Sequence, residues 1–421
     1  MKKPLSLNRI ARIAIASLFF VPPPVMAAAA GELAANNSRT VLATKQSVED
    51  ISSKVESDKK KLQTSLDALD QETVTAEDIY LALCATYTNI YAVTYKDDIG
   101  NGTHAKRVRD GLCVKQPQDP SAYAYIFDGW FENGATNSFD FANTPITNDV
   151  TLAAKWTPAV AAVYEAGSDA TNLCATLAEA FDQAATSYTP ATVTILRDAT
   201  LPMNETAIHG SGSNDTFITI HNDKTVTIGR PNFTGAFEIT GATVVFEGSG
   251  SWIDTRTSGS DHSRFCIGAD DYPSAGAHTG DPANVIVNGG TFEMGNLIAH
   301  LWNVAYGTLT FNGGTIKSGY ARGAAKYCVR AEVQGHVVIN GGTFEGANTK
   351  QPVLAKDSGT VSITGLNETK FAVKDGNESY VTPMASYLAD GYEFKLNEDG
   401  YYRVQETSEA SSTDNTDESA N

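Results

Sequence analysis

Asn288-Gly289-Gly290-Thr291-Phe292 occurs in three versions, the other two being Asn312-Gly313-Gly314-Thr315-Ile316 and Asn340-Gly341-Gly342-Thr343-Phe344. Each version follows a short run of apolar or β-branched residues, and a weaker fourth copy lies at 361–365. The asparagine position recurs after 24 and 28 residues, and Thr364 takes the equivalent place after another 24. A short strand followed by a turn, repeated at this period, is typical of a β-solenoid.

The predicted fold class is mainly β, with a right-handed parallel β-helix over residues 159–404. In such a fold the apolar residues of each strand face inward and stack on their equivalents in the next turn. The Asn-Gly pair would form the corner, since both residues tolerate left-handed backbone angles, and the asparagines are expected to form a ladder. Further strands are predicted at Thr192–Leu196, Phe217–Ile220, Val226–Ile228, Phe237–Ile239 and Val244–Phe246.

Both ends of this predicted β-helix carry sequences that predict caps. Thr176 and Glu179 have the spacing of a capping box, which predicts a short helix before the first strand. Residues 392–404 have the pattern of a hairpin, which would cover the last turn and its exposed strand edges. The order of helix and strand at the start resembles the N-terminal cap of bacterial pectin-lyase-like parallel β-helix surface proteins.

Residues 88–158 form a separate unit in which strand-like runs alternate with turns. Three segments stand out in it: Phe127-Asp128-Gly129-Trp130-Phe131, Phe139-Asp140-Phe141, and the stretch from Pro145 to Trp156. These segments resemble the Listeria–Bacteroides repeat, also called the internalin B-type repeat. The resemblance implies a small β-grasp-like module of a bacterial surface protein. Ala124 departs from the family pattern, which has glycine at this position.

The aromatic residues of this unit allow two interpretations. They are Trp130, Phe131, Phe139, Phe141 and Trp156. A module of this size needs large aromatic side chains for its core, and that interpretation is favoured. The alternative is an exposed aromatic platform that stacks on sugar rings.

The first 27 residues have the features of a secretory signal peptide. Basic residues up to Arg12 precede an apolar run at 13–21, and small residues follow at 27–30. The apolar run is shorter than the roughly 20 residues that a membrane span needs. The first cysteine is Cys84, too late for a lipid attachment site, and the chain has no LPxTG motif. We therefore expect a secreted or cell-surface protein with no membrane span after cleavage.

Residues 28–85 are predicted to begin as a flexible leader and to continue as an amphipathic helix. An apolar stripe with heptad-like spacing runs through residues 41–69, and it consists of Val48, Ile51, Val55, Leu62 and Leu69. This stripe could join copies of the chain in a coiled coil, which would make the protein an oligomer. The alternative is a helix that packs on its own neighbouring domain.

Charge and cysteine content limit the class of partner and the redox chemistry. The formal net charge is −18, which disfavours phosphate backbones, so nucleic acid is not expected as a partner. The five cysteines lack the spacing of metal ligands, and we expect them to be mostly buried small hydrophobic residues rather than a disulfide framework.

Residues 405–421 are polar and acidic, a composition that predicts a disordered tail.

The repeat rhythm is interrupted between Trp252 and Asn284, so residues 253–283 are predicted to form a loop that leaves the wall. Loops on a rigid scaffold often carry ligand contacts. This one is rich in polar side chains: Asp254, Arg256, Asp261, His262, Arg264, Asp270, Asp271, Tyr272 and His278. A weaker basic strip follows, made of Lys317, Arg322, Lys326 and Arg330. It could receive acidic glycans, although a solvated edge paired with acidic neighbours is favoured.

The sequence favours binding over catalysis. A calcium solenoid would need an aspartate ladder after its glycines, and the repeated phrase has none, so no metal or cofactor is expected. A β-helix enzyme should gather at least three of Asp254, Asp261, Arg264, Asp270, Asp271 and His300 in one groove. His300 lacks the flanking glycines of a polygalacturonase-like site, and no Arg-x-Lys is present. The sequence therefore assigns no catalytic, cofactor-binding or metal-ligating residue.

Three functions remain in order of preference. The first is an exported, adhesin-like protein whose wall or 253–283 loop binds a glycan or a host or microbial surface ligand. The second is a β-helix carbohydrate-active enzyme, either a polysaccharide lyase or a glycoside hydrolase. The third is a structural spacer on the cell surface.

Overall fold

The computed structural model describes residues 57, 60, 89–100, 102–201, 207–210, 216–228, 237–254, 265–268, 281–293, 300–317, 327–345, 351–366, 368–373 and 376–407. The chain divides into two compact units, one of residues 1–121 with 127–155 and one of residues 122–126 with 156–421. The predicted signal peptide and nearly all of the predicted leader, helix and tail lie outside the described residues. Ser57 and Lys60 are helical, and both lie within the predicted amphipathic helix.

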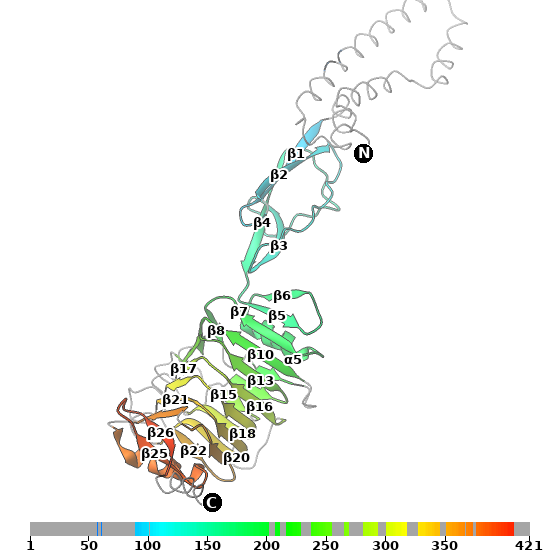
Figure 1. The fold of residues 1–421 in the computed structure, drawn as a ribbon. Helices are drawn as coiled ribbons and strands as arrows, with labels where there is room; N and C mark the ends of the chain where they lie inside the picture. The colour runs from blue at the N-terminus through cyan, green and yellow to red at the C-terminus, as the bar shows by residue number, and fades with distance from the viewer. Residues whose placement is uncertain are drawn as a thin grey trace, which may run out of the picture. The chain divides into compact units, whose positions relative to one another are not determined.

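The small module is a four-stranded mixed sheet (Figure 1). Its strands are β1 (Ile90–Asp97), β2 (Gly102–Arg109), β3 (Tyr125–Glu132) and β4 (Val150–Pro158). They lie in the order β2-β1-β4-β3, with β1 antiparallel to β2 and parallel to β4. The first and last strands are thus the parallel central pair, an order that agrees with the β-grasp-like module expected here.

The aromatic residues of the module build its core. Trp130 is only 2% exposed, and its ring meets those of Tyr95 and Phe127 edge-on at centroid distances of 5.0 and 5.6 Å. Phe139 and Phe141 pack against the same cluster. The core interpretation of Trp130, Phe139 and Phe141 is therefore confirmed.

The second unit is a parallel β-solenoid built from three stacks of strands (Figure 1). The first stack contains β7 (Ala191–Ile195), β10 (Phe217–Asn222), β13 (Thr243–Glu247), β16 (Ala283–Val287), the second halves of β18 (His300–Phe311) and β20 (Tyr327–Ile339), and β23 (Thr360–Ile363). The second contains β8 (Ala199–Leu201), β11 (Thr225–Ile228), β14 (Ser251–Asp254), β17 (Thr291–Glu293), β19 (Thr315–Lys317), β21 (Gly342–Glu345) and β24 (Thr369–Ala372). The third contains β9 (Ala207–His209), β12 (Phe237–Thr240), β15 (Phe265–Ile267), the first halves of β18 and β20, and β22 (Val353–Ala355).

Neighbouring strands within each stack are parallel, which confirms the predicted parallel solenoid, while its right-handed sense stays a prediction. The alternation of β-strands explains why these sequences fold in this way. In β10, for example, Ile218 and Ile220 are fully buried, whereas Thr219 and His221 lie on the outer face. The inward residues of all three stacks form one continuous core with a column of aromatic rings, including Phe246, Phe292, Trp302, Phe311 and Phe344.

The repeated phrase forms the corner between the first and second stacks, as predicted. Its asparagines form a ladder, in which Asn312 donates to Asn288 and Asn340 donates to Asn312, both at 2.9 Å. The Asn-Gly pair lies in the bend, but neither Asn288 nor Gly289 has a left-handed backbone angle. The second glycine has one, with φ of +87° at Gly290 and +88° at Gly314, while the asparagine supplies the hydrogen bond.

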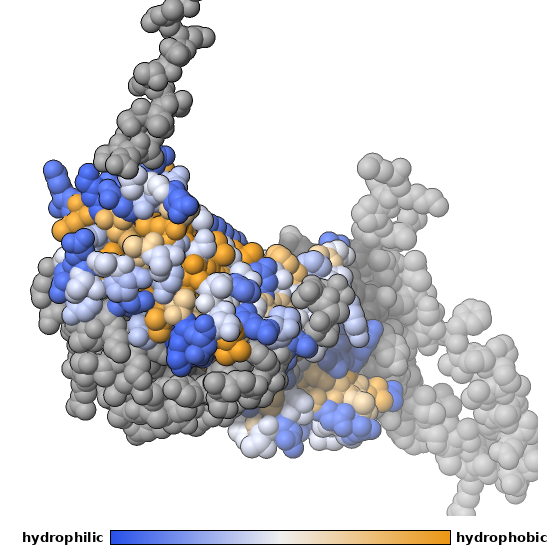
Figure 2. Space-filling view, turned by 90° about the horizontal axis from the view of Figure 1, so that it is seen from below, coloured by the Kyte–Doolittle hydropathy of each residue, from blue (hydrophilic) through white to orange (hydrophobic). Residues whose placement is uncertain are grey.

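Both predicted caps are present. The helix α5 (Leu177–Thr186) begins at Thr176, whose hydroxyl accepts a hydrogen bond from the Glu179 amide at 3.1 Å. It follows β5 (Ala161–Glu165) and β6 (Thr171–Cys174), which add antiparallel strands before β7. At the other end β25 (Tyr392–Leu396) and β26 (Tyr402–Glu406) form an antiparallel hairpin on β24. Figure 2 views the molecule from this end and shows hydrophobic residues at the surface among hydrophilic ones.

The described cysteines follow the prediction of buried small residues in three of four cases. Cys174, Cys266 and Cys328 are buried and Cys113 is exposed, and none of these four forms a disulfide. Burial, with a smaller effect of the Glu179 charge, raises the pKa of the Cys174 thiol to about 11. A thiol with so high a pKa is inert at neutral pH, so the role of Cys174 is packing. Cys84 lies outside the described residues.

Candidate functional site

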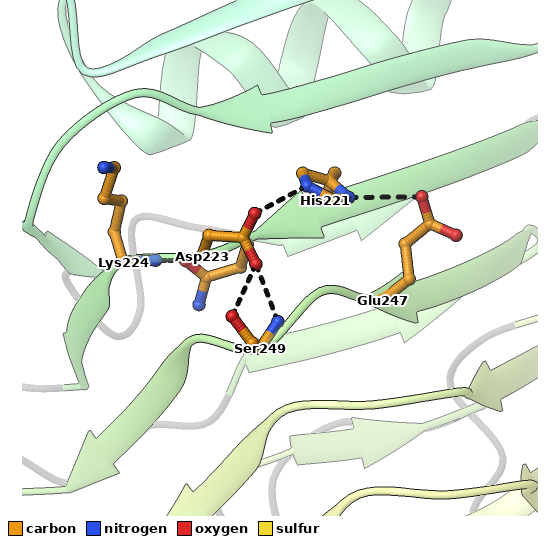
Figure 3. A network of polar contacts seen from close by, with 6 residues as sticks. His221, Asp223, Lys224, Glu247 and Ser249 are labelled. Carbon is orange, nitrogen blue, oxygen red and sulfur yellow. Dashed lines mark hydrogen bonds and ion pairs between the residues drawn. The ribbon is translucent and has the colours of Figure 1, made fainter.

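A polar network lies on the outer surface of the solenoid where β10 and β13 end (Figure 3). His221 places its Nε2 atom 2.9 Å from the Asp223 carboxylate and its Nδ1 atom 3.3 Å from the Glu247 carboxylate. Asp223 also accepts hydrogen bonds from the backbone amide and the hydroxyl of Ser249, both at 2.8 Å. The network therefore joins two successive turns of the solenoid through side chains.

Strand register brings these side chains together. His221 and Glu247 are direct partners in the parallel pairing of β10 with β13, and both lie on the outer face because their neighbours are buried. Asp223 follows in the corner, where Asn222 accepts the Lys224 amide at 2.8 Å and fixes the turn. Such an Asx turn is the ordinary way in which asparagine stabilises a tight bend.

The network shifts the protonation of its own members. Desolvation lowers the pKa of His221, but the hydrogen bonds to Asp223 and Glu247 and the charges of both carboxylates outweigh it, so the pKa lies above its usual value. The two hydrogen bonds from Ser249, assisted by His221, lower the pKa of Asp223 to about 2. Asp223 is thus ionised at neutral pH, and a positive His221 is the form that satisfies both carboxylates.

A pocket opens around the same corner, on the outer face of the second stack. Its volume is about 520 Å³, which lies within the range of ligand pockets. Hydroxyl groups line it from Thr176, Thr200, Thr225 and Thr227, and apolar surface comes from Val160, Ala175, Leu177 and Ala199. Asp198 supplies a carboxylate, which also accepts the backbone amide of Thr225 at 2.9 Å.

The network and the pocket lie on either side of the bend between β10 and β11, and we call the two together the 221–227 corner. It presents hydroxyls, carboxylates and an imidazole, which are donors and acceptors suited to a polyhydroxylated ligand. Lys224 lies between the two halves and is exposed. In the described part of the chain, no group of three or more His, Cys, Asp or Glu side chains is arranged to hold a metal ion.

A second polar cluster is buried on the third stack. Glu332 accepts hydrogen bonds from Arg330 and, at 2.9 Å, from Asn303, and all three side chains are at most 7% exposed. The strand pairing is irregular here, and the following residue, Val333, has φ of +58°. A β-branched residue resists such an angle, and bulges often redirect side chains near functional sites. The ion pair neutralises its own charges, so the cluster has no net charge to attract a ligand.

The predicted loop 253–283 is not a single excursion. Strand β15 (Phe265–Ile267) lies in its middle and belongs to the third stack, because Phe265 and Ile267 fill core positions. The prediction of one long loop is therefore wrong. Residues 255–264 and 269–280 lie outside the described residues.

A β-helix enzyme should gather at least three of six named residues in one groove. Four of these six lie outside the described residues, namely Asp261, Arg264, Asp270 and Asp271. Asp254 is described, and it is 2% exposed at the end of β14. His300 starts β18, where its backbone pairs with Tyr327. Asp254 and His300 thus belong to different stacks of the solenoid.

The predicted basic strip has only two members among the described residues. Arg330 is buried and paired with Glu332, so its place at a solvated edge is corrected, while its pairing with an acidic neighbour is confirmed. Lys317 lies in β19, in register between Glu293 and Glu345 of the adjacent strands. Opposite charges in such a column stabilise a parallel sheet. Arg322 and Lys326 lie outside the described residues.

Sequence reasoning missed the 221–227 corner. The alternation around Ile220 marks His221 as an outward residue, and this signal was available. Its partner Glu247 is 26 residues away, and only the register of β10 and β13 reveals the contact. The pocket was equally hidden, since its lining comes from four separate segments of the chain.

No helix in the described part of the chain combines the length and the apolar character needed to cross a membrane.

Comparison with known proteins finds a match for the small module. No curated protein matches the chain in sequence. Residues 91–155 match the family model of the Listeria-Bacteroides repeat domain, which confirms the resemblance seen in the sequence. This repeat indicates a bacterial surface protein, and the β-solenoid that follows it fits that assignment.

Proposed function

We propose that this chain is an exported, adhesin-like binding protein of a bacterial surface, and that the 221–227 corner binds a glycan. The observation that carries the proposal is the hydroxyl-lined pocket of about 520 Å³ beside the His221 network. Sugars offer closely spaced hydroxyl groups, which need donors and acceptors together with small apolar surfaces. The threonine hydroxyls, the Asp198 carboxylate and the methyl groups of the alanines supply both.

The rigidity of the scaffold supports this role. Four of the pocket residues lie on strands, Ala199 and Thr200 on β8 and Thr225 and Thr227 on β11. The inner faces of these strands are fully packed, since Leu201, Val226 and Ile228 are each 0% exposed. Side chains held by such strands keep their positions without a ligand, which lowers the entropy cost of binding. An open polar pocket of this kind suits weak, selective binding that gains strength when many copies are displayed on one surface.

A glycan array probed with the mature chain tests the proposal. The decisive variants are Thr200→Val and Thr227→Val, which remove one pocket hydroxyl each and keep the β-branched shape that the strands favour. We expect each to weaken binding of the best glycan roughly tenfold, the cost of one buried hydrogen bond left unmade. The matched control is Thr310→Val, which makes the same change on the outer face of the first stack.

Three outcomes would contradict the proposal. The first is glycan binding that all three variants leave unchanged, since the ligand would then contact another surface. The second is release of reducing sugar or of unsaturated products from the glycans by the wild-type chain, which would favour the carbohydrate-active enzyme. Absence of binding to every glycan would favour a protein ligand or the spacer.

A further inference from the structure

Strand β25 is the terminal strand of the second stack, and one of its edges pairs with no strand in the described part of the chain. Its five residues alternate strictly. Tyr392, Phe394 and Leu396 share one face, on which the Phe394 ring packs on Phe371 at 5.5 Å, and Glu393 and Lys395 share the other. Tyr392 and Leu396 remain 37% and 46% exposed. An exposed edge with apolar residues is a ready surface for pairing with another strand.

The backbone of β25 fixes which groups this edge offers. Thr407 donates to the Gly391 carbonyl at 2.8 Å and Asn397 donates to the Tyr401 carbonyl at 3.0 Å, so the odd-numbered residues bond toward β26. The even-numbered residues consequently turn their amides and carbonyls to the other side. Phe394 is the central one of them, while the amide of Tyr392 already makes a 3.3 Å bond to the Ala389 carbonyl.

We propose that β25 is a self-association surface, and that its partner is β25 of a second copy of this chain. The two strands pair antiparallel about Phe394. In this register Tyr392 of each copy lies opposite Leu396 of the other, on the apolar face. Glu393 lies opposite Lys395 on the charged face, and this opposite-charge pair occurs twice because the arrangement is two-fold symmetric.

The charge pattern selects this register against its alternatives. A parallel pairing in register would place Glu393 opposite Glu393 and Lys395 opposite Lys395. An antiparallel pairing shifted by two residues would bring one of these like-charge pairs together as well. Each alternative therefore contains repulsion, and only the pairing centred on Phe394 contains attraction alone.

The test is a charge reversal on the mature full-length chain, followed by sedimentation velocity over a range of concentrations. We expect a wild-type dimer whose dissociation constant rises roughly tenfold in Glu393→Lys and in Lys395→Glu, because each creates two like-charge pairs. The double variant E393K/K395E restores attraction and should return the wild-type constant. Glu398→Lys, in the turn after β25, has the same charge change as Glu393→Lys and should have no effect.

A crosslinking experiment checks the register independently of affinity. Directly opposite residues of an antiparallel pair have Cα atoms roughly 4.5 to 5.5 Å apart, which a disulfide can span. We expect a mixture of Glu393→Cys and Lys395→Cys chains to form a disulfide dimer under mild oxidation, beyond the background of the native cysteines. Neither variant should do so alone.

Three results would overturn the proposal. One is a wild-type chain that stays monomeric at every concentration. Another is a dimer that the charge reversals leave intact, which would place association elsewhere, for example in the 41–69 segment. The third is crosslinking of Glu393→Cys with itself.

Discussion

Asn312 donates a hydrogen bond from its side-chain amide to the side-chain oxygen of Asn288, one turn of the solenoid earlier, at 2.9 Å. Asn340 repeats the same bond to Asn312 at 2.9 Å. The side chain of Asn312 thus acts as donor to the preceding turn and as acceptor for the next. The ladder couples turns that the backbone already pairs, and it sets the position of the corner.

Replacement of Asn312 by alanine should lower the free energy of unfolding by about 1 to 2 kcal/mol, because two ladder bonds are lost and both partners reach solvent. Chemical denaturation of the solenoid measures the change. Asn284→Ala, at an exposed position of β16 on the first stack, is the control and should change the free energy of unfolding by less than about 0.5 kcal/mol. Equal effects of the two changes would mean that the ladder does not stabilise the fold.

Glycine is needed in the corner for two reasons, its left-handed backbone angle and the lack of space for a side chain. Comparison of Gly314 with Gly400, which lies in a different turn, separates the two. Gly314 has φ of +88°, and a Cβ atom there would lie 2.9 Å from the Gly290 carbonyl oxygen. Gly400 has φ of +83°, but a Cβ atom there would meet nothing within 4 Å. Gly400→Ala should therefore cost only the left-handed angle, about 1 kcal/mol, whereas Gly314→Ala should cost clearly more. A smaller loss of stability for Gly314→Ala than for Gly400→Ala in the same denaturation assay would contradict this account.

The corner and its strands could be predicted from the sequence because their signals are local. A β-branched run, an asparagine and two glycines occur within ten residues, and their repetition fixes the period. Alternation then separates inward Ile218 from outward Thr219 without any knowledge of the fold. The unusual conformation of Ala124 also had a local signal, since the repeat family has glycine there and the structure gives φ of +58°.

The third stack and the site could not be predicted in the same way. Strands such as β9, β15 and β22 have three residues each, too few for a periodic pattern, and segments of unequal length separate them from their neighbours. Their core positions are decided by contacts across turns. His221 and Glu247 likewise meet only through register, which no single segment of the sequence specifies.

The Arg330–Glu332 pair should be costly to break because both side chains are buried. Glu332→Gln keeps the shape and an acceptor for Asn303 but leaves the Arg330 charge without its partner. We expect the free energy of unfolding to fall by about 3 kcal/mol, the usual cost of a buried charge that has lost its counter-charge. Glu293→Gln, an exposed position of β17, removes the same charge and serves as control. A loss below about 1 kcal/mol for Glu332→Gln would show that solvent reaches the pair.

Arg197 holds two backbone carbonyls within the solenoid unit. Its guanidinium donates to Ala159 at 2.6 Å and to Ala124 at 2.7 Å, and it lies over the Tyr125 ring at 5.2 Å from the centroid. Arg197→Met keeps most of the apolar stem but loses both bonds, so the free energy of unfolding should fall by about 2 to 3 kcal/mol. Arg107→Met on the exposed face of β2 is the control. Unchanged stability of Arg197→Met in urea denaturation would mean that water replaces the guanidinium without cost.

The His221 network should make the stability of the solenoid depend on pH. The folded pKa of His221 lies above its unfolded value, so its contribution is complete below about pH 6.5 and is lost as the pH rises through the folded value. The depressed pKa of Asp223 acts in the opposite direction, because its contribution is complete above about pH 4 and is lost as the pH falls toward 2. Between these limits the Asp223 carboxylate and the His221 imidazolium are charged together.

His221→Gln should therefore reduce thermal stability most between about pH 4 and pH 6.5, and the difference from wild type should shrink toward pH 9. Glutamine can still donate a hydrogen bond to one carboxylate, so the difference reports the charge. His336→Gln is the matched control, since His336 lies on the same outer face and its ring nitrogen is 2.6 Å from a neutral group, the Thr360 hydroxyl. The measurement is a set of melting curves of wild type and His221→Gln at several pH values. A loss of thermal stability in His221→Gln that grows with pH would refute a positively charged His221 in the folded protein.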